Sequence, residues 1–226
     1  MFYAICGFIL GVIIPYMARR FAKFMPATMA VAVWRLLYPL KNVNRHKKSL
    51  NAKYAELYKS YIWRSVMYGI VLSCLFVFAS INFADNGLCG ILFFIWALLL
   101  LMEIDYKTFL LPDIITVPLL IGGFAFAVFN GGFVTPVESV NGALVGYLLP
   151  VLASILLVWK HPDAFGGGDI KLLSAVGAWV GGINVVYVIL VACMLFAFYS
   201  IIKRRRVGAF GPAIALSAII VAFYCF

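Results

Sequence analysis

Long apolar runs follow one another along almost the whole of this 226-residue chain. The hydrocarbon core of a bilayer requires roughly 20 mainly apolar residues for each helix that crosses it, and the runs are of that order. Hydrophobic residues make up 65% of the chain and charged residues only 12%, which is too little polar surface to cover a soluble globule. The sequence therefore predicts an all-α, polytopic bundle of transmembrane helices, with the lipid bilayer as its solvent and no large soluble domain.

Gly, Pro, Asn and Asp clusters separate the runs and divide them into about eight candidate spans. The spans are residues 2–18, 65–81, 88–104, 112–129, 139–159, 170–181, 184–202 and 208–225. The sixth is short and follows a glycine cluster, as expected for a helix that begins inside the membrane against protein or water. Residues 1–17 resemble a signal peptide in length, but no basic residue precedes them, so a first span is expected.

The distribution of Lys and Arg predicts the orientation of the spans, because basic residues are retained on the cytoplasmic side. With both termini outside, the inner loops 19–64, 105–111, 160–169 and 203–207 hold seventeen of the eighteen basic residues. The remaining one, Lys171, starts the sixth span from the same side, where its long stem can reach the interface. The net charge of +10 then reflects the basic residues that fix the topology and face the lipid headgroups. No nucleic-acid partner is expected. Residues 34–61 mix basic with apolar side chains, which predicts an amphipathic surface helix in part of the first inner loop.

The cysteines and histidines do not suggest a metal site. No two cysteines form a CxxC pair, and each lies in or beside an apolar run, where a small apolar packing role is expected. The two histidines, His46 and His161, are far apart and lie in loops. We therefore expect no bound metal.

Four of the eight acidic residues lie at the cytoplasmic ends of spans, where an ionisable group needs a partner, water or a function. Asp169 follows three glycines and has the local pattern of a helix N-cap. Asp105 has the local pattern of an interfacial acid that faces water or pairs with Lys107. Asp113 follows Pro112 and suits the first turn of the fourth span. The fourth, Glu103, is two residues from Asp105 and so lies on a different helix face.

Asp105 and Asp169 are expected at the same membrane depth on the same side. Two carboxylates in contact can share one proton, so that one acts as general base on a water molecule and the other as general acid. This is the chemistry of an aspartic protease. A small proton-coupled transporter also uses acids within the membrane and remains the alternative, as does a non-catalytic scaffold. We find no repeated halves, which a transporter is expected to show.

Three sequence blocks resemble the prepilin peptidases, the GxGD-type membrane aspartic proteases. The first is IDYKTFLLPD at 104–113 with PLL at 118–120, and the second is GGGDIKLL at 166–173 with GAW at 177–179. The third is FGP at 210–212. The resemblance implies that Asp105 and Asp169 are the catalytic pair. It also implies that the substrates are prepilins of type IV pili or pseudopilins of type II secretion, cut at the cytoplasmic face of the bacterial inner membrane, after a glycine that precedes the apolar helix of the pilin.

The N-terminal part departs from the pattern of the family. Many full-length members also methylate the new N-terminus with S-adenosylmethionine, and they carry two CxxC pairs in the first cytoplasmic loop. Here residues 19–64 contain no cysteine. We therefore expect a reduced methyltransferase-like region at residues 1–64 and a protease core at 65–226. Methylation, and with it S-adenosylmethionine as a cofactor, stays an open alternative for which no binding residues are identified.

Overall fold

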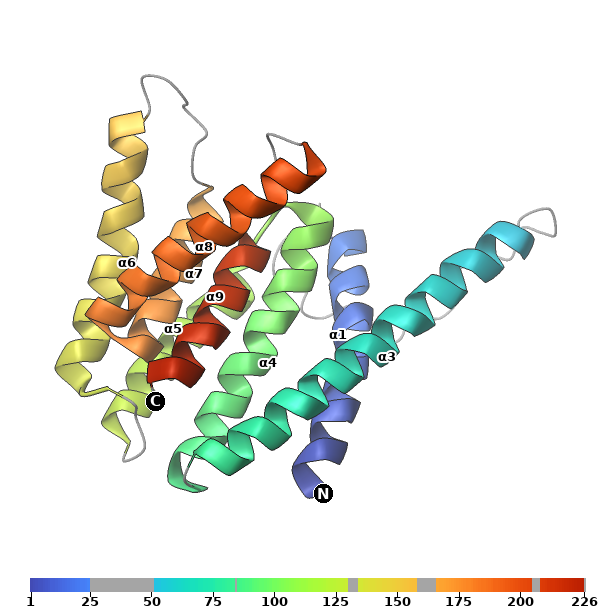
Figure 1. Ribbon diagram of the computed structural model, residues 1–226, viewed down its shortest axis with the longest axis horizontal. Coiled ribbons are helices and arrows are strands. Elements are labelled where there is room, and N and C mark those ends of the chain that lie inside the picture. Colours follow the sequence, from blue (N-terminus) through green and yellow to red (C-terminus); the bar gives the residue numbers. More distant parts are fainter. Residues whose placement is uncertain (25–50, 84, 130–133, 158–165, 205–207, 226) are drawn as a thin grey trace. The chain divides into compact units, whose positions relative to one another are not determined.

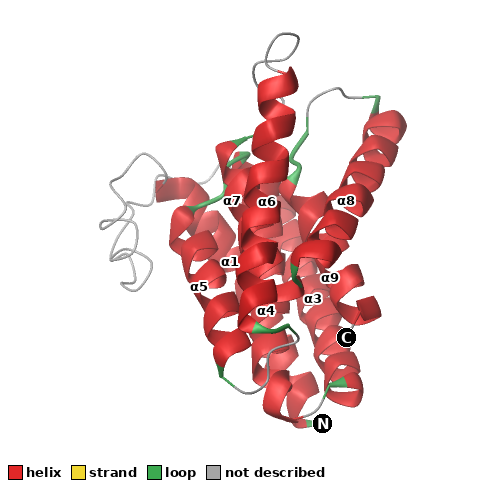
Figure 2. Ribbon diagram, turned by 90° about the vertical axis from the view of Figure 1, so that its left-hand side faces the viewer, coloured by secondary structure: helices red, strands yellow, loops and turns green. Residues whose placement is uncertain are grey.

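The computed structural model describes residues 1–24, 51–83, 85–129, 134–157, 166–204 and 208–225. These residues contain helices and loops but no strand, so the predicted all-α fold is confirmed for them (Figure 2). They separate into two compact units, residues 1–78 and 79–226.

The first unit contains α1 (Phe2–Phe24) and most of α3 (Asn51–Asn82). The two helices pack through glycines, because a Cβ added at Gly7 would lie 2.8 Å from the Cα of Ser73, and one at Gly11 would overlap the backbone at Tyr68. The Ser73 hydroxyl donates a hydrogen bond to the Ala4 carbonyl oxygen at 3.0 Å. Close backbone approach and a serine hydrogen bond are the usual means of association between apolar helices in lipid.

The described residues of the second unit form the end of α3 and six further helices (Figure 1). These six are α4 (Asp85–Thr108), α5 (Asp113–Val128), α6 (Pro136–Leu157), α7 (Gly167–Val180), α8 (Gly182–Lys203) and α9 (Gly211–Cys225). Helix α7 lies at the centre of this unit and contacts α5, α6, α8 and α9. Every residue from 172 to 180 is buried.

Trp179 anchors the centre of the second unit. Its ring lies against those of Phe94 and Phe126, with centroids 5.1 and 5.2 Å away, and its indole N–H donates to the Leu119 carbonyl oxygen at 2.8 Å. This hydrogen bond satisfies the only polar group of the side chain inside an apolar core. Helices α4, α5 and α7 are thereby joined at one residue.

Within the part of the chain that the structure describes, five helices are long and apolar enough to cross a membrane, namely those at 2–22, 59–82, 87–108, 136–156 and 182–203. The protein is therefore a multi-pass membrane protein. The apolar helices α5 and α9, of 16 and 15 residues, are shorter. At 1.5 Å per residue, a 16-residue helix extends only about 24 Å. The eight full spans stay a prediction, although each predicted run contains a helix.

The segment expected as one inner loop, 19–64, is helical at both ends. Helix α1 continues to Phe24, and α3 begins at Asn51. Apolar runs stop at the first charges, whereas a helix continues through residues such as Lys, Glu and Ala that favour it. The predicted surface helix at 34–61 falls partly outside the described residues, and its last part is the beginning of α3.

Candidate active site

Asp105 lies in the last turn of α4 and is only 4% exposed. Its Oδ2 atom accepts a hydrogen bond from the backbone N–H of Gly211 at 2.8 Å. Gly211 is the first residue of α9, so this donor is one of the N–H groups that a helix leaves without an internal partner. The positive end of the helix dipole stabilises a carboxylate placed there. Asp105 is thus held against the start of a helix that is 106 positions away in the chain.

Glycine at position 211 leaves room for the Asp105 carboxylate. A Cβ atom on this residue would lie 2.7 Å from Oδ2 of Asp105 and 3.0 Å from its Cβ. The neighbouring Phe210 packs edge-on against Phe196 of α8, with ring centroids 5.4 Å apart. The predicted third block therefore has a structural role at the site, which the sequence did not reveal because a backbone donor leaves no pattern in the sequence.

Asp169 lies in the first turn of α7, but it is not the N-cap. The N-cap is Gly166, in an extended conformation and without a side-chain cap. Asp169 is three residues further on, and its carboxylate accepts a hydrogen bond from the Gly166 backbone N–H. This is the position and contact of the acidic member of a capping box. The prediction of Asp169 as the N-cap is therefore wrong, because it is the third residue of the helix.

The structure brings Asp105 and Asp169 into electrostatic contact. Partial burial of the carboxyl, and then the negative charge of Asp105, raise the pKa of Asp169 to about 7, while the Gly166 N–H opposes the increase. Asp169 lies outside the five candidate spans. A carboxyl group with this pKa carries a proton for a large part of the time at neutral pH.

The expected pair of acids thus interacts electrostatically in the structure. Among the described residues, no three His, Cys, Asp or Glu side chains lie together as a metal site would require.

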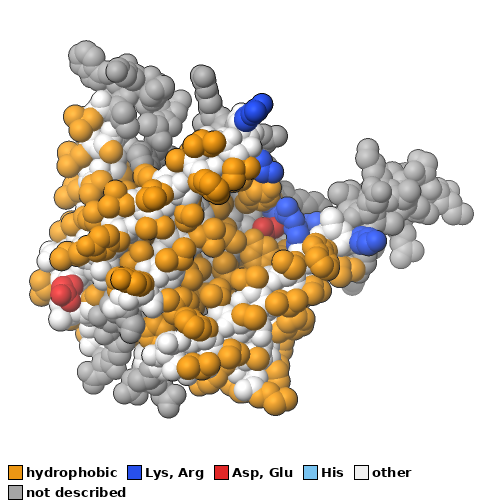
Figure 3. Space-filling model, in the orientation of Figure 1, with side chains coloured by type: hydrophobic (Ala, Val, Ile, Leu, Met, Phe, Trp, Pro, Cys, Tyr) orange, Lys and Arg blue, Asp and Glu red, His pale blue; other side chains and the backbone are white. Residues whose placement is uncertain are grey.

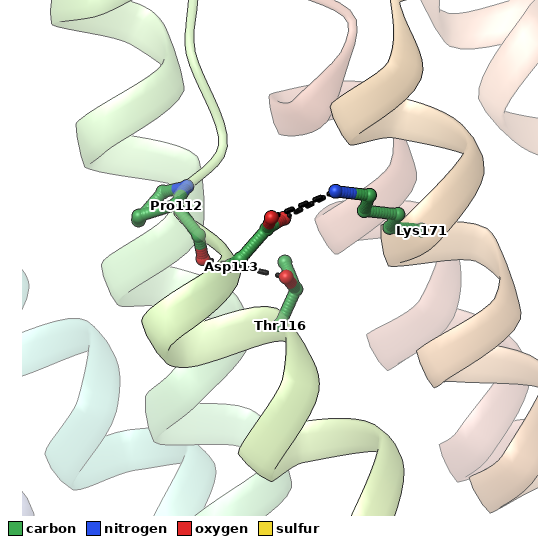
Figure 4. A network of polar contacts seen from close by, with 4 residues as sticks. All are labelled: Pro112, Asp113, Thr116 and Lys171. Atoms are coloured by element: carbon green, nitrogen blue, oxygen red, sulfur yellow. Dashed lines mark hydrogen bonds and ion pairs between the residues drawn. The ribbon is translucent and has the colours of Figure 1, made fainter. Parts of the chain in front are cut away.

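Asp113, expected in the first turn of the fourth span, is the first residue of α5. It also forms an ion pair that was not predicted: Lys171 Nζ lies 2.8 Å from Oδ1 and 2.7 Å from Oδ2 (Figure 4). Pro112, in an extended conformation, precedes the helix, and the Thr116 hydroxyl donates to its carbonyl oxygen at 3.3 Å. The Lys171 side chain of α7 thus reaches the first turn of α5.

Glu103 and Lys107 form an ion pair one helical turn apart in α4. Glu103 is 3% exposed, so this acid is neutralised inside the protein. The pairing of Asp105 with Lys107 that the local sequence suggested is therefore replaced by the pair between Lys107 and Glu103. Asp105 is buried and faces the Gly211 N–H. The other prediction for this residue, an interfacial acid that faces water, is therefore also wrong.

Comparison with known proteins shows which family the chain resembles. A family model described as the type IV leader peptidase family matches residues 92–201. The chain is 37% identical over 141 residues to the prepilin leader peptidase/N-methyltransferase of Aeromonas hydrophila, covering 58% of this chain and 48% of that protein. It is 37% identical over 140 residues to the protein of the same name from Escherichia coli (strain K12), covering 58% and 61%.

The chain thus spans about half the length of the first of these relatives. No solved structure matches it.

Proposed function

This chain belongs to the type IV leader peptidase family, and from that premise we propose that it is an aspartic endopeptidase that removes the leader peptide of type IV prepilins or pseudopilins. The observation that carries the proposal is the electrostatic interaction between Asp105 and Asp169: burial, and then the charge of Asp105, raise the pKa of Asp169. Two acids 64 positions apart in sequence act on each other at neighbouring helix ends.

The surroundings of the two carboxyl groups assign their roles. The Gly211 N–H donates to Oδ2 of Asp105 and holds this carboxyl group in place, and we assign it the role of general base. The pKa of Asp169, near 7, suits a general acid. Asp105 then takes a proton from water as the water oxygen attacks the peptide carbonyl carbon, and Asp169 donates its proton to the carbonyl oxygen.

Collapse of the resulting gem-diol completes the reaction. Asp105 returns its proton to the leaving nitrogen, the C–N bond breaks, and the gem-diol hydroxyl returns a proton to Asp169. The products are a carboxylic acid and an amine, and both side chains regain their starting protonation states. The pair works as a unit with one water molecule.

The glycine turn before α7 is suited to receive a substrate backbone. A Cβ added at Gly167 would meet no atom within 4 Å, and both Gly166 and Gly167 are exposed. An extended peptide can approach the backbone closely where side chains are absent. The turn therefore offers a path for the substrate beside Asp169.

We further propose that the site faces the cytoplasm of a bacterial inner membrane. The proposal rests on the partition of Lys and Arg, seventeen of which fall on one predicted side with Asp105 and Asp169. A basic leader peptide would be retained on that same side.

Co-expression with a candidate prepilin from the same cell, with leader removal followed on a gel, tests the function. Asp105→Asn and Asp169→Asn should each abolish cleavage, because an amide keeps the shape but cannot exchange the proton. Asn can accept the Gly166 N–H at position 169, so loss of the helix start does not explain such a result. Full cleavage by either variant at normal expression would contradict the protease assignment.

Two further variants make the test specific. The double variant should be no worse than each single one, because residues that act as a unit are not additive. Asp113→Asn is the matched control, since it removes a carboxylate at a nearby helix start and should keep most of the activity. Additive partial losses at Asp105 and Asp169 would indicate separate roles.

A further inference from the structure

A cavity of about 740 Å³ lies where α6 begins, α7 ends and α8 begins. Its volume falls within the range of pockets that bind small organic groups. Four of the side chains that line it are polar, namely Glu138, Asn141, Asn184 and Tyr187. Glu138 carries the only charge among the lining residues. The cavity therefore combines one negative charge with uncharged hydrogen-bonding groups and apolar walls.

The cavity lies at the opposite end of α7 from the catalytic acids. Asp169 is in the first turn of α7, and Val180, which lines the cavity, is its last residue. At 1.5 Å per residue, the helix between these two positions extends about 17 Å. Two candidate spans, 136–156 and 182–203, begin at this end of the unit. The cavity is thus at the membrane boundary that lies opposite the catalytic pair.

Glu138 is held as an acceptor at the start of α6. Its Oε2 atom accepts hydrogen bonds from the Thr135 N–H at 2.9 Å and from the Thr135 hydroxyl at 3.0 Å. A carboxylate has two oxygens that each accept, and both of these bonds go to the same one. Oε1 of Glu138 therefore stays available to a cationic group that enters the cavity.

Asn141 is one helical turn beyond Glu138 and presents an amide to the same cavity. It is exposed within the candidate span 136–156, and among the described residues its side chain has no hydrogen-bond partner. A polar group without a partner costs free energy next to hydrocarbon. A ligand with hydrogen-bonding groups in the cavity would remove that cost.

The side of the cavity formed by α8 offers donors for an anionic group. Asn184 uses Nδ2 to donate to the Val180 carbonyl oxygen at 2.8 Å, which fixes the amide at the start of α8, and the Tyr187 side chain lies one turn further on. No side chain caps α8, whose N-cap is Gly181 with a φ angle of +86°. The N–H groups of the first helical turn have no partner inside the helix and suit a phosphate.

We propose that this cavity binds the headgroup of a phospholipid that carries an ammonium group, in the leaflet opposite the catalytic pair. The ammonium group donates to Oε1 of Glu138, and the phosphate oxygens accept from the Asn141 amide and the start of α8. A negatively charged headgroup without an amine is disfavoured, because Glu138 would repel its phosphate. The inference goes beyond the proposed function and does not depend on it.

The surface of α8 provides a path for the acyl chains. Ile183, Tyr187, Leu190 and Met194 are exposed and lie three or four positions apart, so they form one stripe that starts at the cavity. Apolar side chains cover the face that α8 and α9 present in Figure 3. A headgroup in the cavity can therefore keep its acyl chains in contact with the helix surface, which a free amine or phosphate cannot do.

Lipid binding to the full chain, purified in detergent, tests the proposal. Phosphatidylethanolamine and phosphatidylglycerol with the same acyl chains are added in turn, and the bound lipid is counted by native mass spectrometry. We expect phosphatidylethanolamine to bind about tenfold more tightly, since a hydrogen bond between charged groups changes a Kd by about that factor. Equal binding, or tighter binding of phosphatidylglycerol, would overturn the proposal.

Glu138→Gln is the sharpest variant, because the amide oxygen can still accept from Thr135 while the charge is lost. It should weaken the binding of phosphatidylethanolamine to the level of phosphatidylglycerol and leave the latter no weaker. Asp85→Asn is the matched control, since it removes one negative charge at the start of α4, a helix that contributes none of the lining residues. An equal effect of the two variants would contradict a role for Glu138.

A second pair of variants fills the cavity instead. Val145→Trp places a large ring inside it, while Leu148→Trp changes the next turn of α6, where the side chain is exposed and outside the lining. We expect only Val145→Trp to weaken lipid binding, and thermal unfolding without added lipid checks that both variants are folded. If folded Val145→Trp binds the lipid as the wild type does, the lipid occupies another surface.

Two further measurements identify the occupant. Phosphoethanolamine, the headgroup without acyl chains, should not displace the bound lipid at matched concentrations, and displacement would assign the cavity to a free small molecule. Phosphatidylethanolamine with a diazirine near its ester bond should crosslink to Ile183, Tyr187 or Leu190, as mapped by mass spectrometry. Crosslinks only to other segments would overturn the site. None of these measurements involves cleavage, so their failure is distinct from a failure of the protease assignment.

Discussion

Lys171 pairs with Asp113 and not with Asp169, although Asp169 is only two residues away. Residues two apart on a helix point in different directions, so the ammonium group extends from α7 to the first turn of α5. A cation against Asp169 would stabilise its charged form and lower its pKa. The ion pair therefore joins the starts of α5 and α7. It also directs the Lys171 charge away from Asp169, whose pKa it would otherwise lower.

The contribution of this pair to stability should be small. Both side chains are about half exposed, at 50% and 40%, and exposed ion pairs contribute no more than about 1 kcal/mol. A double-mutant cycle with Asp113→Asn and Lys171→Met, followed by thermal unfolding in detergent, should give a coupling free energy within that limit. A coupling free energy several times larger would mean that the pair holds α5 and α7 together.

Cleavage should depend on pH through Asp169. Its pKa is raised to about 7, so the general acid is protonated below that pH and ionised above it. The rate should then fall by about tenfold per pH unit well above 7, because the protonated fraction falls by that factor. Initial rates at fixed substrate between pH 5.5 and 9 check this. A rate that is constant or rises through this range would contradict the assignment of Asp169 as the acid.

Gly211→Ala should reduce cleavage strongly without unfolding the protein. The added Cβ would displace the Asp105 carboxylate, and a misplacement of about 1 Å can cost roughly a hundredfold in rate. Gly182→Ala is the matched control, because Gly182 is the first residue of α8 and its added Cβ would meet its nearest atom at an ordinary 3.8 Å. Similar activity of the two variants would show that the contact of Gly211 with Asp105 does not matter.

The sequence predicted the helices and the acids better than it predicted the contacts between them. Apolar runs indicate helices because burial or lipid requires them, and Asp105 and Asp169 stand out because charges are rare near spans. The bond from Gly211 to Asp105 could not be predicted, since it depends on how α9 docks against α4. The ion pair of Asp113 and Lys171, two residues 58 positions apart, likewise depends on how α5 packs against α7.

The predicted orientation can be tested by labelling. Reporter fusions should place residues 85 and 135 outside the membrane and residues 45 and 205 inside it, because Lys and Arg gather on the second side. A cysteine introduced at Ser49 should resist a reagent that does not cross the membrane. Labelling of that cysteine from the periplasm would overturn the topology and the cytoplasmic site with it.

Methylation is a separate prediction, because the relatives are named for both activities. We expect cleaved pilin to carry one methyl group on its new N-terminus, observed by mass spectrometry as a gain of one CH₂ unit. Residues 25–50 of the methyltransferase-like region expected at 1–64 lie outside the described part of the chain. Added zinc or a chelator should leave cleavage unchanged, since the CxxC pairs are missing. Loss of cleavage on chelation would reveal a metal requirement.

The contact between Gly142 of α6 and Gly177 of α7 restricts how the second unit can move. A Cβ on either residue would overlap the carbonyl group of the other. A shift of one residue along this crossing would bring Ala143 or Ala178 against the opposing backbone, so α6 and α7 cannot slide past each other. Asp169, carried by α7, is consequently fixed in height relative to α6. A rearrangement that separated α6 from α7 would have to give up this contact between the two backbones.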